Sequence, residues 1–465
     1  MIKFGTSGWR GIIGEDFTFE NVRVATQGVA NYLKKSKQKG NGVIVAYDTR
    51  FLSEKFASEA AKLLAYNDIH AYLCNRDVPT PCVSFETVRR KAMGAINFTA
   101  SHNPPEYNGL KFSTSNGAPA LPEITKAIEA EIHEVASTKE RLDVYEKTEL
   151  IETIDPKDRY LAELRNKVDA DVIRQSGLRI AIDSLYGTSR DYLDYFLLEA
   201  GLEVKIIHNY RDPYFGGFSP ECSEKNLGEL RKTVTDEKYD LGLATDGDAD
   251  RFGIIDDRNR FVSPNIILAL LALYLKRYRN IPGGLARSVA TTHLIDAIAR
   301  KLDIPCYETP VGFKYIGELI LADKIALGGE ESAGMSMYRH LPEKDGILAC
   351  LLVAEMLART GKKLHELTDE LYKEFGFFYS KRADMKLTQN LKDSLANRLA
   401  NPPDSLDGLR VREVNTTDGV KLIFDDNTWL LFRLSGTEPV ARIYAEACTP
   451  KDLKHLLDAG KKFVA

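Results

Sequence analysis

The sequence predicts an α/β protein with three related α/β domains and a C-terminal α+β domain, arranged around one central cleft. We expect mixed, largely parallel sheets in the first three domains and an antiparallel sheet in the last. Three observations predict this class. The 465 residues are roughly three times a typical domain of ~150 residues. A strand–helix–strand–strand pattern occurs three times, and the C-terminal portion carries strands separated by short turns.

The predicted elements of the three repeats follow one order. The first repeat has a strand over 42–47, a helix over 53–66 capped by Ser53, and strands over 69–73 and 94–98. The second has a strand over 178–182, a helix over 189–200 closed by Gly201, and strands over 204–207 and 241–244. The third has a strand over 288–291, a helix over 293–302, and strands over 305–308 and 325–327. Such alternation implies parallel sheets covered by helices.

The C-terminal portion has a different pattern. It predicts strands over 420–424, 428–433 and 440–447 and a helix over 451–463, which together form an antiparallel sheet with a helix on one face. The predicted domains are residues 1–145, 146–256, 257–375 and 376–465.

The composition is that of an ordinary folded protein. Hydrophobic residues make up 44% and charged residues 28%, and 63 Lys and Arg nearly balance 67 Asp and Glu. A balanced charge does not favour general binding to nucleic acid, so any anion must be held by a local site. The six cysteines are far apart and suit a reduced cytoplasm better than a disulfide framework or a zinc site.

The longest apolar run, residues 266–275, predicts a buried helix. It is about half of the ~20 residues that a membrane span needs, and Lys276 and Arg277 follow it. The N-terminus has a polar Gly- and Ser-containing turn where a signal peptide has an apolar region. We therefore expect a cytoplasmic protein with neither a membrane nor a nucleic-acid partner, and monomer and homodimer stay open.

A polar loop follows the last strand of each repeat, at residues 99–104, 245–251 and 328–334. Loops at the carboxyl ends of parallel strands are where open α/β sheets bind ligands. The three loops are therefore expected to meet in one cleft.

The loop of the second repeat places Asp246, Asp248 and Asp250 on alternate residues after a buried strand. Several hard oxygen ligands from one short stretch are what Mg²⁺ or Ca²⁺ requires. An EF-hand is disfavoured because Arg251 stands where such a loop needs glycine. A solvated acidic turn is the alternative, although three close carboxylates repel one another unless a cation neutralises them. Arg251 would suit a phosphate group shared with the metal.

The loop of the first repeat places Ser101 beside His102, with Lys111 shortly after. A hydrolase triad is disfavoured because no Gly-x-Ser-x-Gly elbow surrounds the serine, and the side chains of sequence neighbours are expected to diverge. An ordinary turn serine is a further alternative. The cationic and metal loops predicted nearby favour a serine that carries or receives a phosphoryl group.

Three further segments offer groups for a sugar phosphate. The segment 433–437, followed by Arg442, combines a guanidinium, hydroxyls and a glycine amide, which can cradle a phosphate; a plain hairpin turn is the alternative. The segment 329–332 offers carboxylates and a hydroxyl for sugar hydroxyls. Arg10 and Lys344 lie in turns and would be solvated charges in the absence of a site.

With these loops together, the chain resembles the α-D-phosphohexomutase family over nearly its whole length, and within it most resembles the phosphoglucomutase and phosphomannomutase members. Four motifs occur in family order: Thr-Ala-Ser-His-Asn-Pro at 99–104, Asp-Gly-Asp-Ala-Asp-Arg at 246–251, Gly-Glu-Glu-Ser at 329–332 and Arg-Leu-Ser-Gly-Thr at 433–437. The family's architecture, three related α/β domains and a C-terminal domain around one cleft, agrees with the repeat pattern.

The resemblance implies a role for each motif. Ser101 would be the phosphoserine, and Mg²⁺ would be held by Asp246, Asp248, Asp250 and a phosphate oxygen on Ser101. The implied catalytic residues are Ser101, His102, Arg10, Lys111, Arg251 and Lys344. The implied substrate-binding residues are Thr6, Ser7, Gly312, Glu330, Ser332 and Lys344. The implied phosphate-binding residues are Arg433, Ser435, Gly436, Thr437 and Arg442.

The implied reaction interconverts α-D-glucose 1-phosphate and glucose 6-phosphate. Phospho-Ser101 gives its phosphoryl group to the substrate, and the hexose 1,6-bisphosphate, which is both intermediate and activator, turns over in the cleft and returns the other phosphate. Four residues stay open as proton carriers: His102, Lys111, Arg10 and Lys344.

The resemblance favours glucose as the sugar of the substrate because Glu331 is typical of phosphoglucomutases. Val311 departs from the threonine of many phosphoglucomutases, and Glu330 and Ser332 would contact hydroxyls shared by glucose and mannose, so mannose phosphates stay open as further substrates. The alternatives are a phosphoglucosamine mutase, a Mg²⁺-dependent sugar phosphatase with an aspartyl nucleophile in the loop 246–250, and a non-catalytic sugar-phosphate-binding protein.

Overall fold

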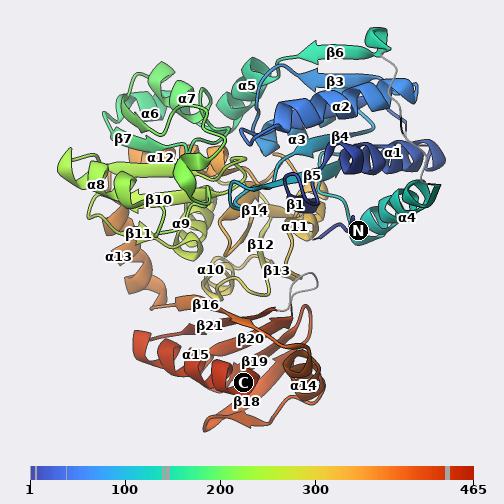
Figure 1. Ribbon diagram of the computed structural model, residues 1–465. Coiled ribbons are helices and arrows are strands. Elements are labelled where there is room, and N and C mark those ends of the chain that lie inside the picture. Colours follow the sequence, from blue (N-terminus) through green and yellow to red (C-terminus); the bar gives the residue numbers. More distant parts are fainter. Residues whose placement is uncertain (1, 6–7, 38, 139–141, 143–146, 435–439) are drawn as a thin grey trace.

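The computed structural model of the chain describes every residue except 1, 6–7, 38, 139–141, 143–146 and 435–439 (Figure 1). Its strands form four sheets. The first has the order β1-β5-β4-β2-β3-β6, with β1 Trp9–Ile12, β2 Val43–Tyr47, β3 Ala71–Cys74, β4 Gly94–Phe98, β5 Tyr107–Thr114 and β6 Ile151–Ile154. Its helices are α1 Phe19–Lys35, α2 Ser53–Tyr66, α3 Thr80–Arg90 and α4 Pro122–Thr138, and a 3-10 turn spans Thr148–Leu150.

The second and third sheets follow along the chain. The second has the order β11-β10-β9-β7-β8, with β7 Arg179–Asp183, β8 Glu203–Ile207, β9 Leu241–Thr245, β10 Phe252–Asp256 and β11 Phe261–Val262. Its helices are α5 Lys157–Lys167, α6 Ala170–Gln175, α7 Leu193–Glu199 and α8 Gly228–Asp236, and a 3-10 turn spans Phe215–Gly217. The third has the order β13-β12-β14-β15, with β12 Gly284–Ser288, β13 Cys306–Thr309, β14 Ile325–Glu330 and β15 Gly334–Met337. Its helices are α9 Pro264–Arg277, α10 Leu294–Leu302, α11 Phe313–Leu321, α12 Gly346–Thr360 and α13 Leu364–Phe375.

The fourth sheet is antiparallel throughout, as predicted, and has the order β16-β21-β20-β19-β18-β17. Its strands are β16 Tyr379–Lys386, β17 Ser405–Leu406, β18 Leu409–Asn415, β19 Val420–Phe424, β20 Trp429–Leu434 and β21 Val440–Ala447, and its helices are α14 Gln389–Ala400 and α15 Pro450–Val464. Both helices share a core with one face of this sheet. Trp429 on the other face packs against Val289 and Ala290 of the third domain.

The first three sheets share one strand order, which confirms the predicted relation between the domains. The shared orders are β5-β4-β2-β3, β10-β9-β7-β8 and β15-β14-β12-β13. In each, three strands are parallel and the strand named first is antiparallel. The three polar loops singled out in the sequence join the same pair of strands in each domain, β4–β5, β9–β10 and β14–β15.

The central strands are buried on both faces, which is why they read as continuous apolar runs. In β2, Val43 and Val45 enter the core formed with α1, α2 and α4, whereas Ile44 and Ala46 enter a separate core beneath α3. The apolar helix α9 is buried from Asn265 to Leu275, as expected for the run 266–275. Within the described residues, no helix has the length and apolarity to span a membrane.

Each repeat contains one more helix than the sequence pattern predicted, namely α3, α8 and α11, between its second and third strands. In α3 the buried face carries Thr80, Ser84 and Thr87 as well as apolar residues. These buried hydroxyls weaken the apolar periodicity on which the prediction depended.

Three predicted details are wrong. Ser53 does not cap α2, because the cap position is Leu52 with a left-handed φ of 61° and the Ser53 hydroxyl donates to Asp48. The helix α7 is shorter than the predicted span 189–200. The third repeat begins at β12 rather than at 288–291. Arg287 is buried in that strand with ion pairs to Asp296 and Glu308, and this charged residue interrupts the apolar pattern from which the strand would have been predicted.

The domains are joined more closely than the predicted boundaries suggest. The strand β6 pairs with β3, so the first sheet extends beyond residue 145. The helix α12 follows the third sheet in the sequence, but it packs on β9 and β10 of the second sheet as well as on α9. One continuous hydrophobic core therefore serves the second and third domains.

Candidate active site

A cleft of about 1390 Å³ lies where the four domains meet. Ser101 of the first domain, Arg251 of the second, Glu330 of the third and Arg433 of the fourth all line it. The cleft thus collects polar residues of all four domains, as predicted.

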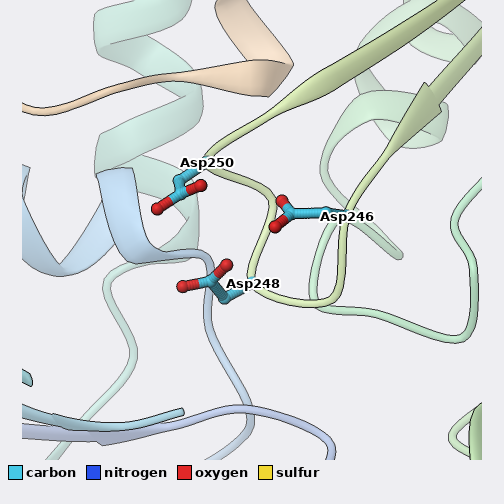
Figure 2. A group of neighbouring side chains, drawn as sticks. All are labelled: Asp246, Asp248 and Asp250. Carbon is cyan, nitrogen blue, oxygen red and sulfur yellow. The ribbon is translucent and has the colours of Figure 1, made fainter. Parts of the chain in front are cut away.

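The carboxyl groups of Asp246, Asp248 and Asp250 converge on one point at the end of β9 (Figure 2). All three residues are buried, and each offers an oxygen within 4.8 Å of the others. Burial, followed by repulsion from the other two carboxylates, raises the pKa of Asp246 well above its usual value. Three carboxylates this close repel one another, and a cation held between them would favour the ionised form of Asp246.

Cationic side chains surround two of these carboxylates. Lys111 Nζ donates to Asp248 Oδ2 at 2.5 Å and to Asp250 Oδ2 at 3.2 Å, and Lys344 Nζ lies 3.1 Å from Asp250 Oδ2. Burial and repulsion from Asp250 oppose ionisation of Asp248. The attraction of Lys111 outweighs both effects and lowers the pKa of Asp248. Both acids are therefore ionised at neutral pH. Thr80 adds a short hydrogen bond to Asp248 Oδ2 at 2.6 Å.

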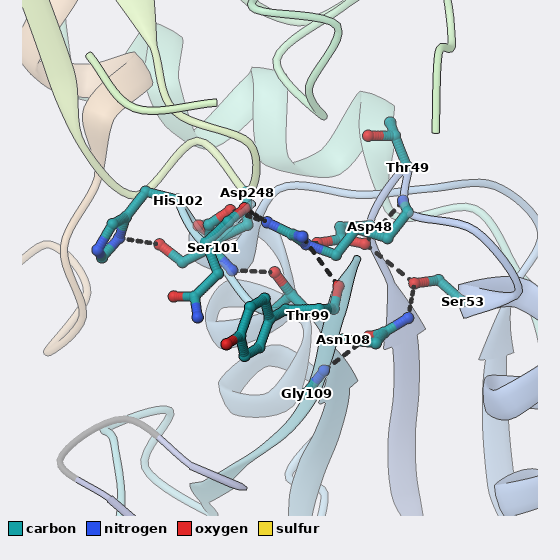
Figure 3. A network of polar contacts seen from close by, with 12 residues as sticks. Asp48, Thr49, Ser53, Thr99, Ser101, His102, Asn108, Gly109 and Asp248 are labelled. Atoms are coloured by element: carbon teal, nitrogen blue, oxygen red, sulfur yellow. Dashed lines mark hydrogen bonds and ion pairs between the residues drawn. The ribbon is translucent and has the colours of Figure 1, made fainter. Parts of the chain in front are cut away.

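Ser101 lies beside this triad. Its hydroxyl donates to Asp246 Oδ2 at 2.8 Å, and its Oγ is 3.3 Å from His102 Nδ1 (Figure 3). The expectation that the two side chains diverge is therefore wrong: the left-handed φ of 51° at Ser101 turns the backbone so that both point into the site. The serine is 2% exposed, so only a group bound in the cleft can reach its hydroxyl.

A neutral imidazole lies among cations at this end of the cleft. Arg251, burial and Arg10 together lower the pKa of His102 well below its usual value. Burial and then Arg251 lower the pKa of Arg10 to about 10, and its Nη1 donates to Asn103 Oδ1 at 2.5 Å. In the described part of the chain, the buried Nε of Arg251 has no hydrogen-bond partner. These groups leave donors available for an anion.

The end of β14 and the loop that follows it bring two further carboxylates, Glu330 and Glu331, to the cleft. Glu330 Oε1 accepts the Gly312 N–H at 2.8 Å, and burial, followed by repulsion from Glu331, raises the pKa of Glu330 to about 7. Glu331 Oε2 accepts from the hydroxyls of Ser288 and Thr291, both at 3.2 Å. Gly312 and Ser332 line the cleft beside them, so the predicted substrate-binding residues of this domain lie together.

Several predicted residues lie outside the described part of the chain: Thr6, Ser7, Ser435, Gly436 and Thr437. The flanking Arg433 and Arg442 face each other on β20 and β21 and line the cleft. Arg433 Nη2 donates to Asp418 Oδ2 at 2.7 Å. The described ends of the predicted phosphate loop therefore lie where an anion in the cleft could be held.

The sequence reading missed three polar residues at the site. Thr80 was missed because α3 was not predicted. Arg382, which lines the cleft from β16, precedes the strands identified in the last domain. Arg50 directly follows β2, the neighbour of β4, and its position at the carboxyl end of a strand was the signal that could have found it.

A buried acidic triad, an adjacent serine and a cationic lining define a phosphoryl-transfer enzyme. Comparison with known proteins agrees with this class. The four family models of phosphoglucomutase/phosphomannomutase match in order: α/β/α domain I at residues 1–139, domain II at 158–259, domain III at 263–375 and the C-terminal domain at 383–460. The chain belongs to the phosphoglucomutase/phosphomannomutase family of α-D-phosphohexomutases and is an isomerase of that type.

Relatives match along nearly the whole chain. A phosphoglucomutase/phosphomannomutase of Thermococcus kodakarensis is 30% identical, over 99% of this chain and 98% of its own. A probable phosphoglucosamine mutase of Methanothermobacter thermautotrophicus is 31% identical, over 99% and 97%. The crystal structure of the Paramecium phosphoglucomutase pp63/parafusin in its open form matches with a TM-score of 0.84 and 25% identity, over 99% of this chain and 94% of that one.

These names support a phosphohexomutase, and they differ in the sugar. They give no support to the phosphatase alternative, since all of them are mutases.

Proposed function

We propose that the protein interconverts α-D-glucose 1-phosphate and glucose 6-phosphate through a phosphorylated Ser101 and glucose 1,6-bisphosphate. The observation that carries this proposal is the contact of 2.8 Å between Ser101 Oγ and Asp246 Oδ2 within the buried triad. A serine in that position can hold a phosphoryl group next to a cation. The cleft of about 1390 Å³ is large enough for a hexose bisphosphate to turn over without leaving.

Mg²⁺ fits the triad. Among the described residues, Asp248 Oδ1 and Asp250 Oδ1 are buried without a hydrogen-bond partner, and hard carboxylate oxygens are the ligands that Mg²⁺ prefers. Asp246, Asp248, Asp250 and a phosphate oxygen on Ser101 would hold the ion. The bound ion would neutralise charge on the transferring phosphoryl group.

The cationic residues of the cleft would have two roles. Arg10, Arg251, Lys111 and Lys344 lie near Ser101 and would neutralise the transferring group, because phosphoryl transfer depends mainly on positioning and electrostatics. Arg433 and Arg442, with Ser435, Gly436 and Thr437 between them in the sequence, would hold the phosphate that does not react. Gly312, Glu330 and Ser332 would bind the sugar in either orientation, and Thr6 and Ser7 are proposed to bind it as well.

His102 is the best candidate for the proton carrier. Its Nδ1 lies 3.3 Å from Ser101 Oγ, and its lowered pKa leaves the imidazole neutral at pH 7. The pKa values of Lys111 and Lys344 are raised by the carboxylates that outweigh their burial. Arg10, with a pKa of about 10, is also protonated at neutral pH. General acid–base catalysis contributes ~10²–10⁴-fold, so His102→Gln should lower kcat by about that factor.

Glucose is proposed as the preferred sugar because Glu331 stands at the second glutamate of the sugar loop. Ser288 and Thr291 donate to its Oε2, and the same carboxylate would accept from a sugar hydroxyl. Mannose phosphates are proposed as further substrates, and a phosphoglucosamine mutase is the second candidate because relatives of similar identity bear that name.

Intact-protein mass spectrometry combined with mutase assays tests the proposal. After incubation with glucose 1,6-bisphosphate, the wild type should carry one phosphate on Ser101, and Ser101→Ala should carry none and lose turnover. Glucose 1-phosphate should give a higher kcat/KM than mannose 1-phosphate or glucosamine 1-phosphate. Full mutase turnover by Ser101→Ala would overturn the mechanism, and a preference for glucosamine 1-phosphate would favour the second candidate.

A further inference from the structure

Arg50 lies beside the loop that carries Ser101 and has no part in the mechanism described above. It follows β2, and the Ser101 loop follows the adjacent parallel strand β4, so both lie at the same edge of the sheet. The Arg50 side chain is fully buried. Its Nε donates at 3.1 Å to Oδ2 of Asp48, which is equally buried.

Among the described residues, the other hydrogen bonds of this guanidinium go to the main chain of the Ser101 loop and of the first residue of β5. Nη2 donates to the carbonyl oxygens of Ser101 and Asn103, both at 2.6 Å. Nη1 donates to those of Pro104 at 2.8 Å and Tyr107 at 2.9 Å. The rigid fork of a guanidinium suits carbonyls spread along a loop, whereas a lysine ammonium offers three donors from a single point.

The loop needs such support because of its backbone. Ser101 has a φ of 51°, in a region that a residue with a side chain rarely adopts unless its surroundings fix it. The Ser101 N–H donates to Thr99 Oγ1 at 2.9 Å, and Arg50 holds the carbonyl of the same residue. These contacts fix the turn that directs Ser101 Oγ toward Asp246.

Neighbouring elements hold Arg50 in place. Ser53 Oγ donates to Asp48 Oδ1 at 3.0 Å and accepts from Asn108 Nδ2 at 2.9 Å, so a chain of hydrogen bonds orients the carboxylate that pairs with Arg50 (Figure 3). The ring of Phe215, from the second domain, lies 5.0 Å from the guanidinium carbon. This cover keeps water away from the hydrogen bonds, which strengthens them.

We propose that Arg50 is a positioning residue for phosphoryl transfer, which holds Ser101 Oγ in its place beside the acidic triad. The inference rests on the proposed function, because it takes Ser101 as the phosphoryl carrier. Arg50 acts on the chemical step and not on substrate binding, since it is absent from the described lining of the cleft.

Arg50→Lys tests this role. A displacement of about 1 Å at a reacting group costs on the order of 100-fold in rate, so kcat should fall by about that factor while KM for glucose 1-phosphate stays within about threefold. The rate of Ser101 phosphorylation by glucose 1,6-bisphosphate should fall in parallel. The matched control is Arg279→Lys, whose guanidinium pairs with the buried Glu355 away from the cleft and should leave both rates unchanged.

A second variant keeps the inference testable if Arg50→Lys does not fold. Asp48→Asn retains the shape of its side chain and removes the charge that orients Arg50, and it should lower kcat, with KM unchanged, by less than Arg50→Lys. A folded variant with wild-type kcat, or with an effect on KM alone, would overturn the inference. Failure of the proposed function would be distinguishable, because the wild type itself would then take up no phosphate on Ser101.

Discussion

At the scale of single residues, the active site is built from buried ionisable groups whose charges are set by their neighbours. Lys111 and Lys344 keep Asp250 ionised and lower its pKa against the opposing effect of burial. Glu330, which lines the same cleft, has no such cation within hydrogen-bonding distance among the described residues, and its pKa rises to about 7. A carboxyl group therefore carries a charge at one place in the cleft and can take up a proton at another.

The raised pKa of Glu330 predicts a pH dependence of stability. Its value of about 7 in the folded protein exceeds the usual 4.5, so the stabilisation is complete below about pH 4.5 and is lost as the pH rises through 7. A difference of about 2.5 units corresponds to roughly 3 kcal/mol. Glu330→Gln keeps the acceptor for Gly312 and should remove this loss, as urea unfolding of the ligand-free protein at pH 5 and pH 8 would show. Equal changes in both proteins would contradict the assignment.

At the scale of elements, the first turn of α12 supports the loop that carries the three aspartates. The Gly346 N–H donates to the Ala249 carbonyl at 3.1 Å, and the side chain of Asp345 caps the helix by accepting the Leu348 N–H at 2.8 Å. A Cβ on Gly346 would lie 2.3 Å from the carbonyl oxygen of Arg251, which is backbone and cannot turn aside. The helix and the loop that carries the aspartates must therefore move together.

Gly346→Ala should consequently displace the loop that carries Asp246, Asp248 and Asp250. We expect a loss of about 1–3 kcal/mol in the free energy of unfolding, together with a lower mutase kcat. Gly228→Ala is the matched control, because Gly228 also begins a helix and a Cβ there would meet no described atom within 4 Å. Urea unfolding and kcat should show no loss for the control, and equal effects of the two changes would refute the steric argument.

Several elements with clear periodicity were predicted from the sequence, and some with buried polar residues were not. The spans of α2, β4, β19 and β21 agree with the predictions because most of their buried residues are apolar and turn residues bound them. The strand β12 was misplaced because an ion-paired arginine is buried within it, and α3 was missed because it buries hydroxyls.

The site itself divides in the same way. The proximity of the three aspartates to one another could be predicted from a short motif, since residues close in the sequence supply them. The contact between Ser101 and His102 depends on a left-handed backbone angle, and that of Arg50 with the Ser101 loop depends on the adjacency of β2 and β4. Neither contact can be predicted from the spacing of residues within a short segment.

The fourth domain packs against the third through one face of its sheet. Trp429 on β20 is fully buried against the third domain, and its Nε1 donates to Glu446 Oε1 at 2.8 Å. Lys421 lies beside it, with Nζ 4.0 Å from the centre of the indole ring and donating to the Val289 carbonyl at 2.8 Å. The contact therefore combines apolar packing with buried polar pairing.

Trp429→Ala should loosen this docking. Removing a buried tryptophan costs about 3–5 kcal/mol, and the chain between α13 and β16 should become sensitive to limited proteolysis. Trp9→Ala, which removes the buried tryptophan of the first domain, should destabilise the protein without exposing that segment. Cleavage at the same rate in both variants would show that Trp429 does not control the docking.

At the scale of the whole molecule, the net charge of −4 conceals a cationic cleft. Arg10, Lys111, Arg251, Lys344 and Arg433 are far apart in the sequence and come from all four domains, yet they line one space. An anion bound there would contact every domain, so its binding and the arrangement of the domains are coupled.

Metal binding should stabilise the assembled protein. An ion that binds only the folded state at 100 times its Kd adds about 2.7 kcal/mol, so Mg²⁺ should raise the unfolding midpoint of the wild type. Asp248→Asn should abolish most of this increase, while Asp194→Asn, which changes a buried aspartate of α7 outside the cleft lining, should retain it. Calorimetry with Mg²⁺ and with EDTA measures the difference. A full increase in Asp248→Asn would remove the triad as the metal site.

The helix α12 has a consequence for how the chain folds during synthesis. The second sheet leaves the ribosome long before α12, whose residues from Gly346 to Leu357 are all buried and complete the core that both middle domains share. Until then, the nascent chain exposes the apolar surface of β9 and β10 that α12 will cover. Such exposed surface invites aggregation and chaperone binding. The second domain therefore becomes a finished unit only once the third has been translated, and a fragment that ends at residue 256 should not be obtained as a stable protein.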